Sequence, residues 1–188
     1  MMTKHWVALA LATVAAGSVL NVANAADQGH GTVNFIGSII DAPCSISPDT
    51  IDQTVNLGQI SNRALMNNGK STPRAFNIKL EDCDVSNLKD KTVTTTFTGT
   101  ESKALPGYLA IAGTASGASI AITADDGANI KLGSASPVAK IQDGKNTLRF
   151  AAYLQGNPPV KGSGSATTPA VIIPGEFTSV ANFTLAYQ

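Results

Sequence analysis

The sequence predicts an all-β fold, an incomplete immunoglobulin-like β-sandwich that lacks its final strand. Beyond residue 25 the chain is rich in Thr, Val, Ile, Ala, Gly and Ser and low in charge. Short alternating apolar stretches recur between turn residues, and long amphipathic helical patterns are missing, which is typical of all-β proteins. The spacing of the stretches indicates an immunoglobulin-like sandwich. The lack of a final strand is inferred from the two ends of the chain.

Turn residues separate the expected strands. Asp126-Gly127 lies between two isoleucine-rich alternating stretches and predicts a hairpin, and Asp143-Gly144 marks another turn. Ser61–Asn68 is expected to hold a short helical turn, and Gly156–Pro174 a long loop or irregular edge. The expected strands are Thr32–Ile40, Gln53–Gly58, Arg74–Asp82, Thr92–Thr98, Leu109–Ala112, Ser119–Thr123, Asn129–Leu132, Thr147–Leu154 and Phe177–Tyr187.

The first 25 residues have the pattern of a secretory signal peptide. Lys4 precedes an apolar stretch from Trp6 to Leu20, and the small-residue pattern Ala23-Asn24-Ala25 follows. The apolar stretch is short for a bilayer crossing. Cleavage after Ala25 leaves 188 − 25 = 163 residues, which suits one domain. We therefore expect an exported protein with a signal peptide at 1–25, an N-terminal extension at 26–35 and one domain at 36–188.

Charge and the scarcity of reactive side chains exclude several classes of function. Without Lys4, 12 basic and 13 acidic residues remain, so nothing draws the exported chain to nucleic acid. His5 leaves with the signal peptide and His30 lies in the extension, so no base accompanies a nucleophile. Asp125 and Asp126 lack the spaced oxygen ligands of a calcium loop and indicate a turn. We expect no catalytic site, no metal and no cofactor.

The two cysteines, Cys44 and Cys83, both follow the signal peptide. An exported chain meets an oxidising compartment, so a disulfide between them is the expected state. Closing a loop of about 40 residues contributes about 4 kcal/mol in the chain-entropy model. The alternative, a pair of catalytic or metal-binding thiols, is disfavoured because the spacing matches no zinc or redox motif.

The start of the exported chain has the pattern of a β-strand that finds no neighbouring strand in its own domain. Ala26–Gly31 is small and polar, and a strongly alternating stretch follows it directly. Such a segment has nothing to fold onto locally, and it is suited to insertion into another molecule's groove. Gly37 and Ile39 either continue this strand or begin the domain's own first strand. Alternation places on one face Gly29, Gly31, Val33, Phe35 and Gly37.

The end of the sequence is an alternating apolar strand. Phe177, Phe183, Leu185 and Tyr187 are expected to face inward. Chain ends normally fray unless they are held, so a buried Tyr187 implies neighbours on both sides of its strand. No residues remain in this sequence to form the next strand, which would leave a groove and an unpaired edge. The N-terminal strand of another copy would fill that groove.

Five segments of the sequence carry distinctive motifs. They are residues 31–37, Asp41-Ala42-Pro43-Cys44-Ser45-Ile46, residues 52–59, Phe76–Cys83 and the end of the chain from Gly175 to Tyr187. Together they resemble the major-subunit family of chaperone–usher pili, closest to the P-pilus and type 1 rod subunits. The family's end motif is a glycine fourteen residues from the C-terminus with a penultimate tyrosine, which Gly175 and Tyr187 match. The resemblance covers nearly all of the exported chain.

The resemblance implies the protein's partners. A periplasmic chaperone would insert a strand beside Phe177–Tyr187 and anchor the carboxylate of Gln188. An outer-membrane usher would then exchange that strand for the N-terminal extension of the incoming subunit. The product would be a head-to-tail polymer, a fimbria, that carries a tip adhesin on the cell surface and supports adhesion. The implied acceptor and chaperone-binding residues are Gly175, Phe177, Phe183, Leu185, Tyr187 and Gln188.

Two other functions remain open from the residues. One is a minor subunit of the same kind of pilus, an adaptor or a terminator. The other is a secreted β-sandwich lectin, for which Tyr108 and Tyr153 are the candidate sugar-stacking residues, since Trp6 lies in the signal peptide. A lectin should be a stable monomer without a chaperone.

Overall fold

The structure is a computed structural model that describes residues 29–161 and 167–188. The expected signal peptide, its cleavage site and residues 26–28 of the expected extension lie outside the described residues. Ile40–Gln188 forms one compact unit, and a second unit ends at Ile39. No described helix is long and apolar enough to cross a membrane.

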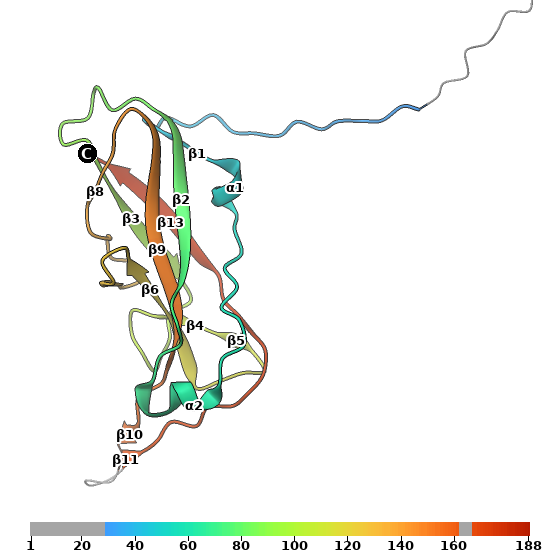
Figure 1. The fold of residues 1–188 in the computed structure, drawn as a ribbon, viewed down its shortest axis with the longest axis vertical. Helices are drawn as coiled ribbons and strands as arrows, with labels where there is room; N and C mark the ends of the chain where they lie inside the picture. Colours follow the sequence, from blue (N-terminus) through green and yellow to red (C-terminus); the bar gives the residue numbers. More distant parts are fainter. Residues whose placement is uncertain (1–28, 162–166) are drawn as a thin grey trace, which may run out of the picture. The chain divides into compact units, whose positions relative to one another are not determined.

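The larger sheet is antiparallel and is built around its longest strand, β9 (Gly144–Gly156). Alternating apolar residues in β9 match those of its two neighbours, so both pairings bury the same face. Figure 1 shows these strands side by side. The order is β1 (Ser45–Ile46), β2 (Arg74–Cys83), β9, β6 (Ala118–Ala124) and β4 (Leu109–Ala110), and β7 (Asn129–Ile130) also pairs with β6.

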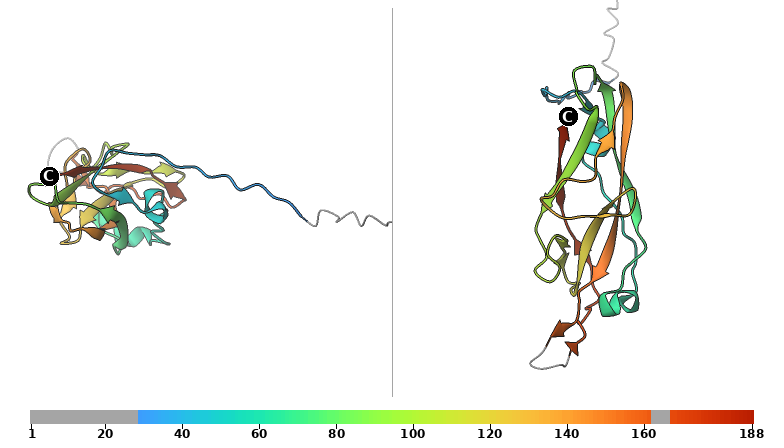
Figure 2. Two further views of the ribbon diagram at one scale, coloured as in Figure 1. Left: turned by 90° about the horizontal axis from the view of Figure 1, so that it is seen from above. Right: turned by 90° about the vertical axis from the view of Figure 1, so that its left-hand side faces the viewer.

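A smaller sheet packs against the larger one. Its order is β13 (Ala181–Tyr187), β3 (Thr92–Gly99) and β8 (Ala139–Lys140). The two views in Figure 2, with Figure 1, place β13 and β9 in different layers. The remaining elements are the pairs β5 (Ala112–Gly113) with β12 (Phe177–Thr178) and β10 (Val160–Lys161) with β11 (Thr167–Thr168), the helices α1 (Pro48–Ile51) and α2 (Asn62–Leu65), and the 3-10 turn η1 (Met66–Asn68).

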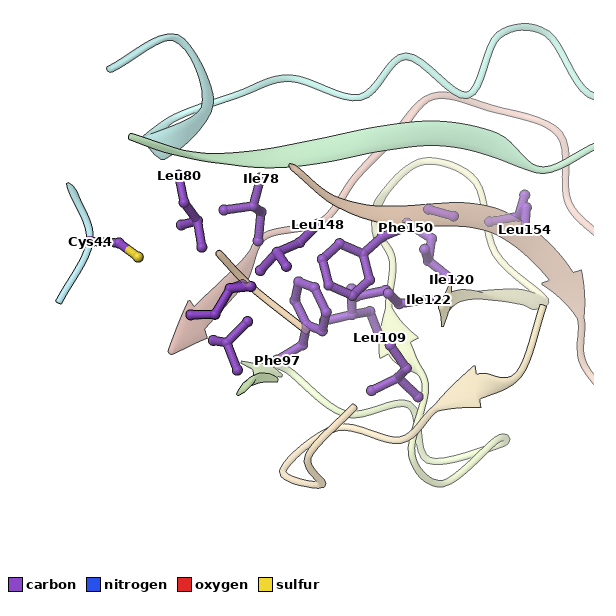
Figure 3. Close-up of a cluster of buried hydrophobic side chains, with 14 of the residues drawn as sticks. Cys44, Ile78, Leu80, Phe97, Leu109, Ile120, Ile122, Leu148, Phe150 and Leu154 are labelled. Carbon is purple, nitrogen blue, oxygen red and sulfur yellow. The ribbon is translucent and has the colours of Figure 1, made fainter. Parts of the chain in front are cut away.

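The core lies between the two sheets. Ile78 and Leu80 of β2 are completely buried. Phe97 of the smaller sheet meets Phe150 of the larger one edge to face, with ring centroids 5.1 Å apart, which is a favoured aromatic geometry. Figure 3 shows these side chains converging from both sheets. Full burial of such a side chain contributes about 1.5–3 kcal/mol, so the core supplies most of the driving force for folding.

A disulfide joins Cys44 and Cys83, which are 39 positions apart in the sequence, and both residues are buried. This confirms the expected pairing. The bond fastens the residue before β1 to the last residue of β2, and Ser45 and Ile46 pair with Glu81 and Leu80 beside it. The start of the compact unit is therefore linked covalently to the larger sheet.

Replacing both Cys44 and Cys83 by serine is expected to lower the free energy of unfolding by about 4 kcal/mol, because the unfolded chain regains the freedom that the loop removes. The measurement is chemical denaturation of the purified protein with and without the two substitutions, in oxidising buffer. An unchanged midpoint would show that the disulfide contributes nothing to stability.

Most long strands expected from the alternating pattern are present. The Asp126-Gly127 turn is present in the β6–β7 hairpin, where Gly127 has a φ of +82° and donates its N–H to Ala124 O. Glycine adopts such a conformation without the strain of a Cβ atom. The helical turn expected within Ser61–Asn68 is present as α2 and η1. The expected predominance of β-strands is therefore confirmed.

Other expectations differ from the structure. Thr32–Ile40 and Gln53–Gly58 form no strand. Both alternate, but a strand also needs a neighbour for its backbone groups, and neither has one among the described residues. The expected strand Phe177–Tyr187 divides into β12 and β13, which pair with different neighbours, β5 and β3. The helix α1 and the strand β8 were not expected.

Candidate functional site: the open edge of β13

One edge of β13 pairs with no strand that the structure describes. β13 pairs with β3 along its whole length, with Phe183 opposite Phe97 and Leu185 opposite Thr95. Across the described residues, no strand pairs with its other edge. In an antiparallel strand, alternate residues direct N–H and C=O groups to each side. Half of the backbone groups of β13 are therefore available to another strand.

The inner face of the smaller sheet is covered unevenly. On β3, Val93, Thr95 and Phe97 are 1–2% exposed. Their cross-strand partners on β13, Tyr187, Leu185 and Phe183, are only partly buried, although they pack against the same core. The core is thus closed over β3 and open toward the free edge of β13.

The residues expected at the acceptor edge fall into two places. Phe183, Leu185 and Tyr187 lie together on the inner face of β13, and Gln188 continues the strand through two backbone hydrogen bonds with Thr92. Phe177 lies instead in β12, opposite Gly113, where it packs against the core partly buried.

Gly175 precedes β12 and lies against Thr114 and Ala115. A Cβ atom here would approach Thr114 Oγ1 to 2.5 Å and Ala115 N to 2.6 Å. Only glycine allows this close approach. The structure therefore gives Gly175 a role in bringing the chain into β12, ahead of the open edge.

A cavity that the sequence did not indicate lies beside β2. It has a volume of about 390 Å³ and is lined by residues 50 and 53–56 and by residues 74–77 and 79. Val55 and Phe76 contribute apolar surface, and Phe76 is the only partly exposed member of an aromatic trio with Phe97 and Phe150. Gln53 Nε2 donates to Asn77 O at its rim. Only alternation in β2 hinted at an inward Phe76, and nothing in the sequence placed residues 53–56 beside it.

The described part of the N-terminal extension exposes large apolar side chains. Residues 29–39 take part in no helix or strand. Phe35 is 92% and Val33 is 73% exposed, and both lie on the alternating face expected to insert. Gly31 and Gly37, on the same face, have open space where a Cβ atom would be. Exposed apolar surface of this kind usually marks a binding segment.

A fimbrial protein family model matches residues 33–188. The chain belongs to this family. It is 61% identical to Fimbria A protein of Serratia marcescens over 95% of this chain and 96% of that protein. It is 53% identical to the Major MR/P fimbria protein of Proteus mirabilis over 94% and 92% of the two chains. A solved structure of a chaperone–usher pilus matches with a TM-score of 0.72 at 34% identity, covering 86% of this chain and 97% of that one.

The protein is therefore a major structural subunit of chaperone–usher fimbriae on the cell surface, and it is not an enzyme. The similarity to major subunits favours this function over a minor subunit and over a lectin.

The two tyrosines considered for sugar stacking in the fimbrial subunit are both hydrogen-bonded to Asn129. Tyr153 is 4% exposed and donates to Asn129 Oδ1, and Asn129 Nδ2 donates to Tyr108 Oη. Lys70 Nζ lies 5.2 Å from the Tyr153 ring centroid. Asp126 accepts from the N–H of Ala128 within the hairpin turn. Among the described residues, no cluster of three metal-ligating side chains occurs.

Burial raises the pKa of the Tyr187 phenol above its ordinary value of 10.0. The neutral phenol is favoured in the folded subunit, so its contribution to stability is full below pH 10 and is lost as pH rises through the raised pKa. We raise the pH from neutral to above the pKa of Tyr187 in the folded subunit. Over this range we expect Tyr187→Phe fimbriae to lose less thermal stability than unmodified fimbriae. Differential scanning calorimetry of both measures this difference, and parallel losses would contradict it.

Proposed function

We propose that the fimbrial subunits join by donor-strand exchange. In this proposal, the extension of one copy adds as a strand to the open edge of β13 in the next copy and completes an immunoglobulin-like sandwich. The observation that carries the proposal is the coincidence of two features among the described residues. One edge of β13 pairs with no described strand, and the exposed apolar residues 32–37 form no strand. β13 needs a neighbouring strand for its free edge, and the segment needs a strand to pair with.

Backbone pairing would supply the affinity of the joint. The free N–H and C=O groups of β13 need partners, and strand addition is the usual way in which an open edge binds a peptide. Side chains would then fix the register, because a shift of one residue turns Val33 and Phe35 away from the core. The glycines at 29, 31 and 37 on the same face would leave room where the groove is shallow.

The half-buried side chains of β13 support an inward orientation of the donor. Insertion of Val33 and Phe35 beside Phe183 and Leu185 would bury the inner face of β13, as the inner face of β3 is already buried. Burying the Phe35 ring alone contributes about 1.5–3 kcal/mol. The donor residues in this proposal are Gly29, Gly31, Val33, Phe35 and Gly37.

A free subunit with this edge uncovered would be prone to pair with the wrong strand. We infer that a periplasmic chaperone covers β13 with a strand of its own until assembly, and that an outer-membrane usher directs the exchange. Other subunits, including a tip adhesin, would join through the same edge. The adhesion that the fimbria supports follows from carrying that tip away from the cell surface.

Deletion of Ala26–Phe35 tests the proposal. The intact and the shortened chain are each co-expressed with the periplasmic chaperone and examined by size-exclusion chromatography and electron microscopy. We expect fibres only from the intact chain, and a one-to-one chaperone complex from the shortened one. A stable chaperone-free monomer from both chains would show that the sandwich is already complete and would overturn the proposal.

A further inference from the structure

A buried amide on β9 has one atom without a hydrogen-bond partner. Gln155 is 4% exposed. Its Nε2 donates to two oxygens of Asn68, the side-chain Oδ1 at 2.7 Å and the backbone O at 3.3 Å. Its Oε1 is buried, and no donor in the described part of the chain reaches it. Buried polar atoms are rarely left unmatched in folded proteins.

Reversing the Gln155 amide does not remove the problem. The reversed amide would direct its oxygen at the backbone O of Asn68, which can only accept. Its NH2 group would then occupy the position where no partner is found. Whichever orientation is chosen, one polar atom of Gln155 requires a group that residues 29–161 and 167–188 do not supply.

The hydroxyl proton of the residue opposite Gln155 is already used. Ser119 of β6 is directly opposite Gln155 and is completely buried. Its Oγ–H donates to Ser102 Oγ at 2.7 Å and to Asn157 Oδ1 at 3.2 Å. A hydroxyl group has one proton, so Ser119 has none left for Gln155 Oε1.

We propose that one buried water molecule binds beside Gln155 and donates a hydrogen bond to Oε1. Water can donate twice and accept twice, and buried waters typically satisfy such groups with about three hydrogen bonds. A metal cation does not suit the site, because it would need several free oxygens and the network offers one.

This water strengthens a connection that backbone hydrogen bonds also make, because Gly156 N–H donates to Gly69 O directly after η1 and Lys70 bridges to Gln155. Gln155 holds η1 through Asn68, while Ser119 and Asn157 belong to the network on β6 and at the end of β9. The water satisfies the remaining polar atom of the amide that holds η1. It thereby helps to fix the turn at η1 to the outer face of the larger sheet.

The test is a cryo-electron microscopy map of assembled fimbriae at a resolution that shows ordered water. We expect one peak within hydrogen-bonding distance of Gln155 Oε1 in the unmodified fimbria, and its loss in Gln155→Met. The matched control is Asn68→Gly, which removes the 2.7 Å contact and retains the peak. Asn68 has a φ of +63°, which glycine adopts freely.

The map of the unmodified fimbria decides the question even if Gln155→Met does not assemble. The absence of a peak at Oε1, or a protein donor in direct contact with it, would overturn the proposal. A peak that persists at the same place in Gln155→Met would also overturn it, because the water would then be held by other groups.

Discussion

Phe35→Arg is expected to abolish incorporation of the subunit as a strand donor. Phe35 is 92% exposed in the free extension, and in the proposed joint its ring faces the core. An arginine there would forfeit about 1.5–3 kcal/mol of burial and would bring an unpaired charge into an apolar groove. Co-expression with the tagged unmodified subunit, followed by mass spectrometry of purified fibres, measures the incorporated fraction. Binding to the chaperone should remain, because β13 is unchanged.

Asn34→Arg is the matched control for this prediction. Asn34 is adjacent in the extension but lies on the opposite face of the alternating pattern, so its arginine would point away from the groove and incorporation should stay near normal. Normal polymerisation of Phe35→Arg would show that the assignment of the inserting face is wrong. Equal loss for both variants would indicate a general effect of charge rather than insertion.

Leu185→Asp is expected to abolish the acceptor function and chaperone-assisted accumulation together. Leu185 is on the inner face of β13, opposite Thr95 and partly buried against the core. A carboxylate there would lose its water as the incoming strand covers it, at a cost of several kcal/mol for an unpaired charge. The yield of chaperone complex from periplasmic extracts and the number of fibres per cell measure both effects.

Thr184→Asp separates this effect from a simple change of charge. Thr184 neighbours Leu185 but is exposed on the outer face of the same strand. Its aspartate stays in water, so both readouts should change little. If Leu185→Asp still formed the chaperone complex and normal fibres, the open edge of β13 would not be the acceptor.

The long strands were predictable because their patterns are long. β2 and β9 contain ten and thirteen residues, which is enough alternation to identify the buried face. α1 has only four residues, too few for a helical period. Its start does carry a local signal, Ser47 before Pro48 and Asp49, which is typical of a helix N-terminus.

Other features depend on contacts between distant segments. β8 consists of Ala139 and Lys140, and only its pairing with Thr92 and Val93 makes it a strand. Conversely, Gln53–Gly58 alternates well but has no ladder partner, so propensity alone did not form a strand. The cavity beside Phe76 likewise requires two segments about 20 residues apart. Local patterns carry no information about contacts between segments that are distant in the sequence.

The candidate site was predictable in part. Alternation assigned Phe183, Leu185 and Tyr187 to one face of a terminal strand, and the structure places all three on the inner face of β13. The pattern did not show that the strand bends after Thr178 and pairs Phe177 with Gly113 instead. It also did not show that β3 is fully covered while β13 is half-covered, because burial is a property of the packed sheets.

The most direct test of donor-strand exchange is solid-state NMR on fimbriae assembled from a mixture of subunits. Half of the subunits carry only ¹⁵N and the other half only ¹³C, so that every ¹⁵N–¹³C contact joins two different molecules. Donor-strand exchange predicts contacts between residues 29–37 of one subunit and β13 of another. Intermolecular contacts that leave β13 out would contradict it. In a second sample, uniformly labelled subunits are diluted into unlabelled ones, so that labelled contacts arise within one molecule. Contacts between residues 29–37 and β13 that appear only in this second sample would also contradict donor-strand exchange.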